Sequence, residues 1–210
     1  MKRRTLDVIF SIGGLLIAGL ILVLGLVLQN QANFASNYVH SQLAQQKITF
    51  TPAAALKPDE NAACLKAFAG QPLTTGAQAE CYANHYIAVH LQGIDGGKTY
   101  AESSGGARAL QAQLATMPDQ TSPAAVALAA NVKAANTRVD TLFKGETLRG
   151  LLLTSYGFSI FGTRAHQAAL VCFAVAIVLL LASIAGFIHA ATKSADQQIL
   201  TAHEPVEQSA

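Results

Sequence analysis

The amino-acid sequence predicts an all-α membrane protein in which two antiparallel transmembrane helices bracket an extracytoplasmic helical domain. Its 210 residues are 51% hydrophobic and only 12% charged, with a mean hydropathy of +0.34, whereas a soluble domain is roughly 25% charged. Two uncharged apolar runs of bilayer length flank the middle of the chain. The stretch between them is rich in Ala, Gln and Leu and shows no sustained strand alternation.

The two apolar runs cover residues 8–28 and 168–188, and neither contains a charged residue. At the rise per residue of an α-helix each run reaches about 30 Å, which is the hydrocarbon thickness of a bilayer. Buried helices of soluble proteins are usually shorter and carry a polar face. We therefore expect transmembrane helices over residues 8–28 and 166–189.

Basic residues beside the first run set the expected orientation. Lys2, Arg3 and Arg4 precede it, and positively charged flanks stay in the cytoplasm. Residues 1–7 and 190–210 are therefore expected inside the plasma membrane, and residues 30–165 outside it. The basic start also suits a signal peptide, but the apolar run exceeds an h-region of about 7–15 residues and no A-x-A site follows. We expect an uncleaved anchor.

Small residues recur at spacings of three and four in both runs, which predicts a helix-packing seam. Such residues let helix backbones approach closely in lipid, either within the chain or against a partner's helices. Gly and Ala are also simply common in membrane helices, so both interpretations stay open. The seam comprises Ser11, Gly14, Ala18, Ile21 and Gly25 in the first run and Ala169, Cys172, Ala176, Leu179, Ser183 and Gly186 in the second.

Helix-start signals divide residues 29–145 into several predicted helices. Capping-box patterns begin at Thr75 and Thr99, and Asp95-Gly96-Gly97 predicts a turn. Ser122-Pro123 opens the last helix, which Gly145 is expected to end. The predicted helices cover residues 30–46, 59–68, 75–91, 107–116 and 123–144. The expected buried face of the third consists of Ala79, Tyr82, Ala83, Tyr86 and Val89.

Residues 146–165 form an apolar segment before the second run. Two interpretations stay open: a helix lying at the outer membrane interface, or the core helix of the outer domain. In either case its apolar surface is a candidate partner site. The candidate interface residues are Leu148, Leu151, Leu152, Tyr156, Phe158 and Phe161.

Cys64 and Cys81 lie on consecutive predicted helices. Because we expect both outside the cytoplasm, where disulfides persist, we predict a disulfide that staples the two helices. The alternative is two free buried thiols. Cys172 lies within the second run and is expected to act as a small packing residue.

Candidate sites for other chemistry are weak. His85 and His90 are five residues apart and point about 140° apart on a helix, whereas zinc-binding helices use i, i+3 or i, i+4 pairs. Gln92 stands where a phosphate-binding loop before Lys98-Thr99 would need glycine, and a net charge of +2 is too small to define a nucleic-acid partner. We therefore expect no metal, cofactor, nucleotide or nucleic acid, and no catalytic residue.

Several short sequence segments, here called phrases, resemble those of a family of uncharacterised actinobacterial two-span membrane proteins. The resemblance covers most of the chain to about residue 180 and implies the same two-span layout. Members are often labelled as aromatic ring-opening dioxygenases. Iron-dependent ring cleavage needs two histidines and a carboxylate around an open iron site. The phrases are Met1-Lys2-Arg3-Arg4-Thr5, Lys47-Ile48-Thr49-Phe50-Thr51-Pro52, Thr75-Gly76-Ala77-Gln78-Ala79, Tyr82-Ala83-Asn84-His85-Tyr86-Ile87, Gly96-Gly97-Lys98-Thr99-Tyr100 and Gly145-Glu146-Thr147-Leu148-Arg149-Gly150-Leu151-Leu152.

Three functional hypotheses are compatible with these features. The first is a non-catalytic accessory subunit of a plasma-membrane complex, such as a respiratory oxidase or another membrane oxygenase. Its outer domain would brace or cover a partner, and its contacts would be membrane lipid and other integral subunits. The second is a self-associating membrane protein that binds a lipid or small ligand in the outer domain. The third is a metal-dependent extracytoplasmic enzyme that uses His85 or His90.

Overall fold

The computed structural model describes residues 3–192, and these residues are helical throughout apart from turns and loops. They contain one isolated β-bridge, between Thr49 and Pro72, and no strand. The all-α class is therefore confirmed. Lys2 and the expected cytoplasmic tail from residue 193 onward lie outside the described residues.

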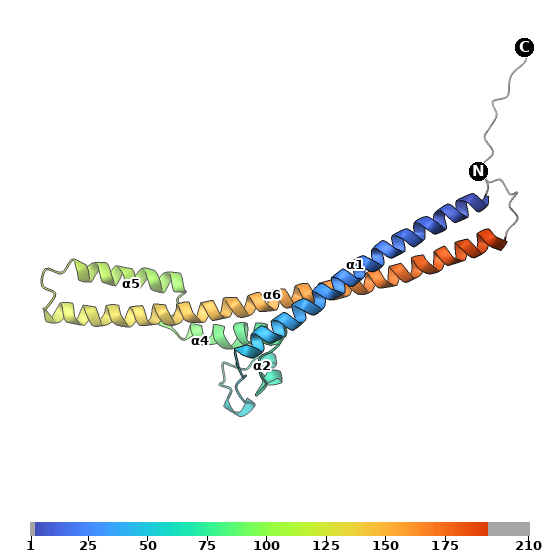
Figure 1. Cartoon of the computed structure of the whole chain (residues 1–210). Coiled ribbons are helices and arrows are strands. Elements are labelled where there is room, and N and C mark those ends of the chain that lie inside the picture. The colour runs from blue at the N-terminus through green and yellow to red at the C-terminus, as the bar shows by residue number, and fades with distance from the viewer. Residues whose placement is uncertain (1–2, 193–210) are drawn as a thin grey trace, which may run out of the picture. The chain divides into compact units, whose positions relative to one another are not determined.

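Two long helices run through the two compact units into which the chain divides (Figure 1). Helix α1 covers Arg3–Gln45 and helix α6 covers Pro123–Thr192. With 43 and 70 residues they measure about 65 and about 105 Å along their axes. Unit 1 comprises Met1–Phe34 and Gly162–Ala210, and unit 2 comprises Ala35–Phe161.

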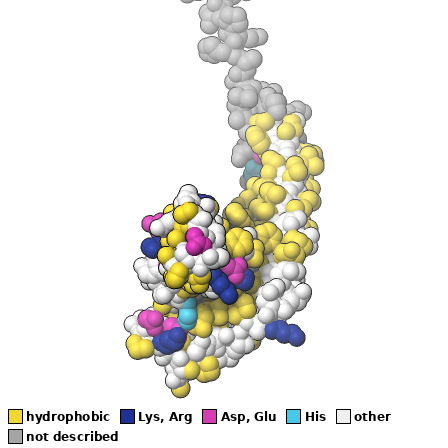
Figure 2. Space-filling view, turned by 90° about the vertical axis from the view of Figure 1, so that its left-hand side faces the viewer, with side chains coloured by type: hydrophobic (Ala, Val, Ile, Leu, Met, Phe, Trp, Pro, Cys, Tyr) yellow, Lys and Arg dark blue, Asp and Glu magenta, His cyan; other side chains and the backbone are white. Residues whose placement is uncertain are grey.

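Unit 1 is a pair of apolar helix segments with little buried surface. Both α1 and α6 are long and apolar enough to cross a membrane, and only 17% of the most apolar window of each is buried. The core helix of a soluble protein would be mostly buried instead. Figure 2 shows hydrophobic side chains spread over the surface of these segments. Unit 1 therefore presents to its surroundings the kind of surface that a bilayer covers.

The expected end of a helix at Gly145 is wrong, because α6 continues unbroken to Thr192. A glycine inside a helix costs only about 1 kcal/mol relative to alanine. In this position glycine also admits the side chain of Leu91, whose Cδ2 occupies the place that a Cβ would need. Residues 146–165 are therefore a middle portion of α6.

Two further helix starts differ from the sequence predictions. Helix α5 covers Tyr100–Ala115 and begins directly at the Thr99 capping box instead of at residue 107. Helix α2 covers only Ala63–Phe68, because the backbone before it turns at Lys57 and Glu60, where Lys57 N–H donates to the Glu60 carboxylate at 3.1 Å. Thr51-Pro52 leads into a single 3₁₀ turn, η1, over Ala53–Ala55.

The helix predicted from Thr75 is confirmed as three consecutive helical segments: α3 over Gly76–Cys81, a π-helical turn η2 over Tyr82–Ile87 and α4 over Ala88–Gln92. Its Thr75 capping box is formed. The π turn winds more widely than an α-helix, so residues four apart keep to one face. The buried members of that face are Ala79, Ala83, Ile87 and Leu91. The other residues expected there, Tyr82, Tyr86 and Val89, are only partly buried.

Helix α5 lies along the first part of α6 within unit 2 (Figure 1). The turn before α5 is the expected one, with positive φ at Asp95, Gly96 and Gly97. The amide of Gln111 donates to Asn136 at 3.1 Å, and the rings of Tyr100 and Phe143 are 5.8 Å apart. These contacts hold α5 against the first part of α6.

Candidate functional site

The predicted disulfide between Cys64 and Cys81 is confirmed, and the two Cα atoms are 6.1 Å apart. It joins α2 to the last residue of α3, where Cys81 is buried. The bond closes a short loop over residues that contribute Leu65 and Leu73 to the domain core. Cys172 is a free thiol in α6.

A row of aromatic side chains crosses this core. The rings of Phe68, Phe50, Tyr82 and Tyr86 follow one another, with centroids 4.6 to 5.5 Å apart. Burial raises the pKa of Tyr82 to about 12, with smaller contributions from Tyr86 and the Glu60 carboxylate. The Tyr82 side chain is therefore neutral over the physiological pH range.

His90 ends the aromatic row and contacts Glu60, a pairing that the sequence did not indicate. His90 Nε2 lies 3.3 Å from Glu60 Oε1, and Nδ1 lies 2.8 Å from the carbonyl oxygen of Tyr86. Glu60 is only 2% exposed, although glutamate is rarely buried without a partner. Both ring nitrogens of His90 are thus engaged within the domain.

The structure does not bring His85 and His90 together into a metal site. His85 is exposed on the π turn, whereas His90 faces Glu60. Residues 3–192 contain no group of three or more His, Cys, Asp or Glu side chains placed to hold a metal ion.

A second polar cluster centres on Asp95 in the turn η3, which covers Asp95–Gly97. Its carboxylate accepts a hydrogen bond from the Ser103 hydroxyl at 2.8 Å and pairs with Arg138 at 2.8 Å and Lys98 at 3.6 Å. The Ser103 hydrogen bond is the main reason that the pKa of Asp95 is lowered. The cluster ties η3 to both α5 and α6, which is a structural role.

The predicted seam residues face one another in unit 1. Ser11, Ala18, Ala169, Ala176 and Ser183 are buried there, in segments that otherwise expose their side chains. A Cβ on Gly14 would stand 2.5 Å from Ser183 Oγ, and one on Gly25 would stand 3.2 Å from the Cβ of Cys172; Gly186 faces Ser11 in the same close manner. The small residues therefore set how closely α1 and α6 approach.

Polar side chains join the two helices at both ends of this seam. His189 Nδ1 lies 2.9 Å from Asp7 Oδ2 at one end, and His166 Nδ1 lies 2.9 Å from Gln29 Oε1 at the other. We call these two contacts the clasps. They bracket the apolar portions of α1 and α6.

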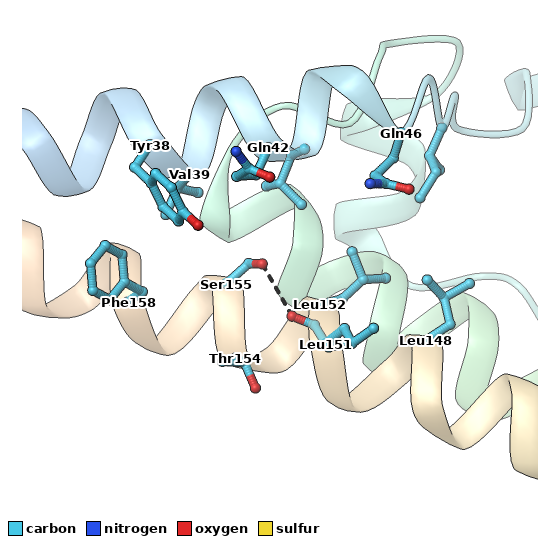
Figure 3. A pocket seen from close by; sticks show the side chains of 12 residues that line it. Tyr38, Val39, Gln42, Gln46, Leu148, Leu151, Leu152, Thr154, Ser155 and Phe158 are labelled. Carbon is cyan, nitrogen blue, oxygen red and sulfur yellow. Dashed lines mark hydrogen bonds between the residues drawn. The ribbon is translucent and has the colours of Figure 1, made fainter.

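Unit 2 carries a groove of about 390 Å³ between the end of α1 and the middle of α6 (Figure 3). Side chains from both helices point into the space between them, and most are apolar. The hydroxyl of Ser155 donates to the carbonyl oxygen of Leu151 at 3.1 Å, so that side chain lies flat against its own helix. The groove is lined by Tyr38, Val39, Gln42, Leu43, Gln46, Ile48, Leu148, Leu151, Leu152, Thr154, Ser155 and Phe158.

Four of the six predicted interface residues line this groove: Leu148, Leu151, Leu152 and Phe158. Tyr156 lies on another side of α6, where its Cα approaches Gly76, and Phe161 is 74% exposed. Leu152 is 3% exposed and belongs to the core, so α6 serves both as a core helix and as an exposed apolar surface. The sequence analysis did not indicate the opposite wall, which includes Tyr38, Val39 and Leu43 of the predicted helix over residues 30–46.

Arg149 connects the α6 wall of the groove to the π turn. Its guanidinium donates to Asn84 Oδ1 at 3.3 Å and to Glu146 Oε2 at 3.3 Å. The groove is therefore backed by the disulfide-linked core. Comparison of the chain with protein-family models, curated proteins and solved structures found no match.

Proposed function

We propose that this chain is a two-span plasma-membrane protein that acts as a non-catalytic accessory subunit, with its outer helical domain bracing an integral membrane partner. The observation that carries the proposal is the exposed apolar surface of α6. Exposed large hydrophobic side chains recur on this helix in two places, from Leu148 to Phe161 in unit 2 and from Leu170 to Ile188 in unit 1. In the second stretch, Cys172 and Ser183 are the polar residues. Soluble monomers rarely expose contiguous apolar surface on this scale.

The polar clusters of unit 2 support a structural role. Glu60 with His90 holds the segment before α2 against α4, and Asp95 with Arg138 holds η3 against α6. Each cluster contacts groups of its own domain, where it contributes to the fold. The exposed side chain of Phe161 is the surface that this domain offers to a partner.

The disulfide supports an extracytoplasmic location for unit 2. Disulfides persist in oxidising compartments and are rare in the cytosol. The Cys64–Cys81 bond and the basic residues before the first apolar run therefore favour the same orientation, with residues 35–161 outside and both chain ends inside.

Site-specific photo-crosslinking in intact cells tests the proposal. A photoreactive amino acid replaces Phe161, which is highly exposed, and Lys133, which is exposed on the same helix, serves as the matched control position. We expect a discrete adduct with another membrane protein from position 161 and none from position 133. Mass spectrometry of the complex purified in mild detergent identifies the partner.

Three outcomes contradict this function. The first is recovery of the chain as a lone monomer under every mild condition without an adduct. The second is an adduct that contains two copies of this chain, which favours self-association. The third is a stoichiometric metal ion that is lost in the His90→Ala variant, which favours the enzymatic hypothesis.

A further inference from the structure

We infer that the groove between α1 and α6 binds one hydrocarbon chain of a membrane lipid, an inference that rests on the proposed membrane location. The groove has a volume of about 390 Å³, within the range of small-molecule sites. Its lining combines Val, Leu and Ile side chains with two aromatic rings and a few polar groups. This is the usual composition of a pocket for an apolar ligand.

The size of the groove favours a lipid chain over a partner helix. A helix with its side chains is about 10–12 Å across, so it would rest on the rim of this groove without filling it. An extended hydrocarbon chain is narrow enough to lie between Val39 on α1 and Leu151 on α6. Leu151 is 62% exposed, and a lipid chain would cover it.

The walls of the groove belong to the same two helices that carry the apolar runs, which favours a membrane lipid as the ligand. Along α1, the exposed ring of Phe34 lies between the apolar run and the groove residues, and along α6 the exposed ring of Phe161 does the same. Aromatic side chains in such positions are typical of the membrane interface. Phe34 on α1 and Phe161 on α6 therefore offer apolar contacts in stretches whose other residues are mostly polar.

The polar groups of the groove suit an amphiphile. Tyr38 and Phe158, whose rings are 6.0 Å apart, are the lining residues nearest along each helix to the apolar runs. Gln42 and Gln46 follow further along α1 (Figure 3). Their amides supply hydrogen-bond donors and acceptors for the polar portion of the lipid, while the hydrocarbon chain lies toward Phe158.

Photo-labelling of the full-length protein in vesicles tests the inference. The vesicles consist of phosphatidylethanolamine and phosphatidylglycerol with a trace of phosphatidylcholine that carries a diazirine midway along one acyl chain. After irradiation, peptide mass spectrometry locates the label. We expect label in peptides that contain residues 38–48 and 148–158, in addition to the apolar runs.

Variants of α6 provide the matched comparison. Ser155→Trp fills the groove and is expected to lower labelling of residues 38–48 by about tenfold, while labelling of the apolar runs stays unchanged. Thr147→Trp places the same side chain at an exposed position that does not line the groove and should leave the pattern intact. Leu151→Gln, at an exposed position, makes the groove polar without filling it and should also lower labelling.

The outcomes separate the two proposals. Label in the apolar runs alone, or groove label that survives both Ser155→Trp and Leu151→Gln, overturns the lipid site and leaves the membrane location standing. Absence of label throughout α1 and α6 overturns the membrane location as well. A crosslink through the groove to a second copy of this chain shows that the occupant is protein and also overturns the inference.

Discussion

His166 on α6 lies 2.9 Å from Gln29 on α1, and this contact has a counterpart where His189 lies 2.9 Å from Asp7. At the rise per residue of an α-helix, Asp7 and Gln29 are separated by about 33 Å along α1, and His166 and His189 by about 35 Å along α6. Both separations are close to the thickness of a bilayer's hydrocarbon core. The two clasps therefore mark where each helix would leave the hydrocarbon.

The proposed orientation predicts which positions a membrane-impermeant maleimide can reach in intact cells. In a Cys172→Ser background, Lys133→Cys is expected to react from outside, whereas Arg4→Cys should react only after the cells are lysed. The native Cys64 and Cys81 are disulfide-bonded and do not interfere. Reaction of position 133 only after lysis would refute the orientation.

Replacing Gly14 by Leu should destabilise the helix pair of unit 1. A Cβ at Gly14 would stand 2.5 Å from Ser183 Oγ, whereas Gly13 has no atom within 4 Å of its Cβ position. Overpacking of this kind costs about 1–3 kcal/mol. Thermal unfolding in detergent, followed by circular dichroism, should show a lower midpoint for Gly14→Leu and little change for Gly13→Leu. Equal midpoints would contradict the seam.

Removal of the disulfide should destabilise unit 2. The bond closes a loop with a sequence separation of 17, and loss of such a link costs about 3 kcal/mol in the chain-entropy model. The Cys64→Ser/Cys81→Ser variant should unfold at a lower temperature than the parent, and reduction of the parent should reproduce the effect. Cys172→Ser, which removes the free thiol, is the control and should behave like the parent.

Asp95 should make unit 2 sensitive to acid. The pKa of Asp95 is lowered in the folded state, mainly by the hydrogen bond from the Ser103 hydroxyl. Asp95 therefore stabilises the folded state at pH values above the pKa that it has in the unfolded chain, and this stabilisation is lost as the pH falls through the folded-state pKa. Asp95→Asn should flatten the decline in stability below about pH 4, and Ser103→Ala should flatten it in part. Unfolding midpoints measured across this range check the effect, and parallel curves for all three proteins would exclude it.

Tyr82 should make the domain sensitive to strong alkali. Burial raises the pKa of Tyr82 to about 12. The contribution of the neutral Tyr82 side chain to stability is therefore complete below the pKa that it has in the unfolded chain, and it is lost as the pH rises through the pKa in the folded state. Spectrophotometric titration should show one phenolate that appears late, and Tyr82→Phe should remove that step. A late step that persists in the variant would assign it to another tyrosine.

The helical class, the two long apolar helices and the disulfide follow from local signals that the sequence states directly. Charge-free runs, capping boxes at Thr75 and Thr99, and two cysteines in a segment expected outside the membrane each have a physical meaning that does not depend on distant residues. The capping boxes form as expected, since their hydrogen bonds lie within four consecutive residues.

The features that sequence analysis missed depend on contacts between distant segments. Gly145 does not end α6 because Leu91 fills the space beside it, and Glu60 is buried because His90, thirty residues later, lies against it. The groove needs Tyr38 and Phe158 from opposite ends of the domain. The residue pattern within one segment does not show which distant segment packs against it. These contacts are therefore seen only in the folded structure.

Because α1 and α6 are continuous helices, the number of residues in each one determines the position and direction of its side chains. Each added or deleted residue in an α-helix turns everything beyond it by about 100° and shifts it by about 1.5 Å. Between Ala169 and Ser183, which both belong to the seam of unit 1, α6 offers no loop to absorb such a change. Natural variants should therefore tolerate substitutions in this stretch far better than single-residue insertions, and any lengthening should come in whole heptads matched on both helices.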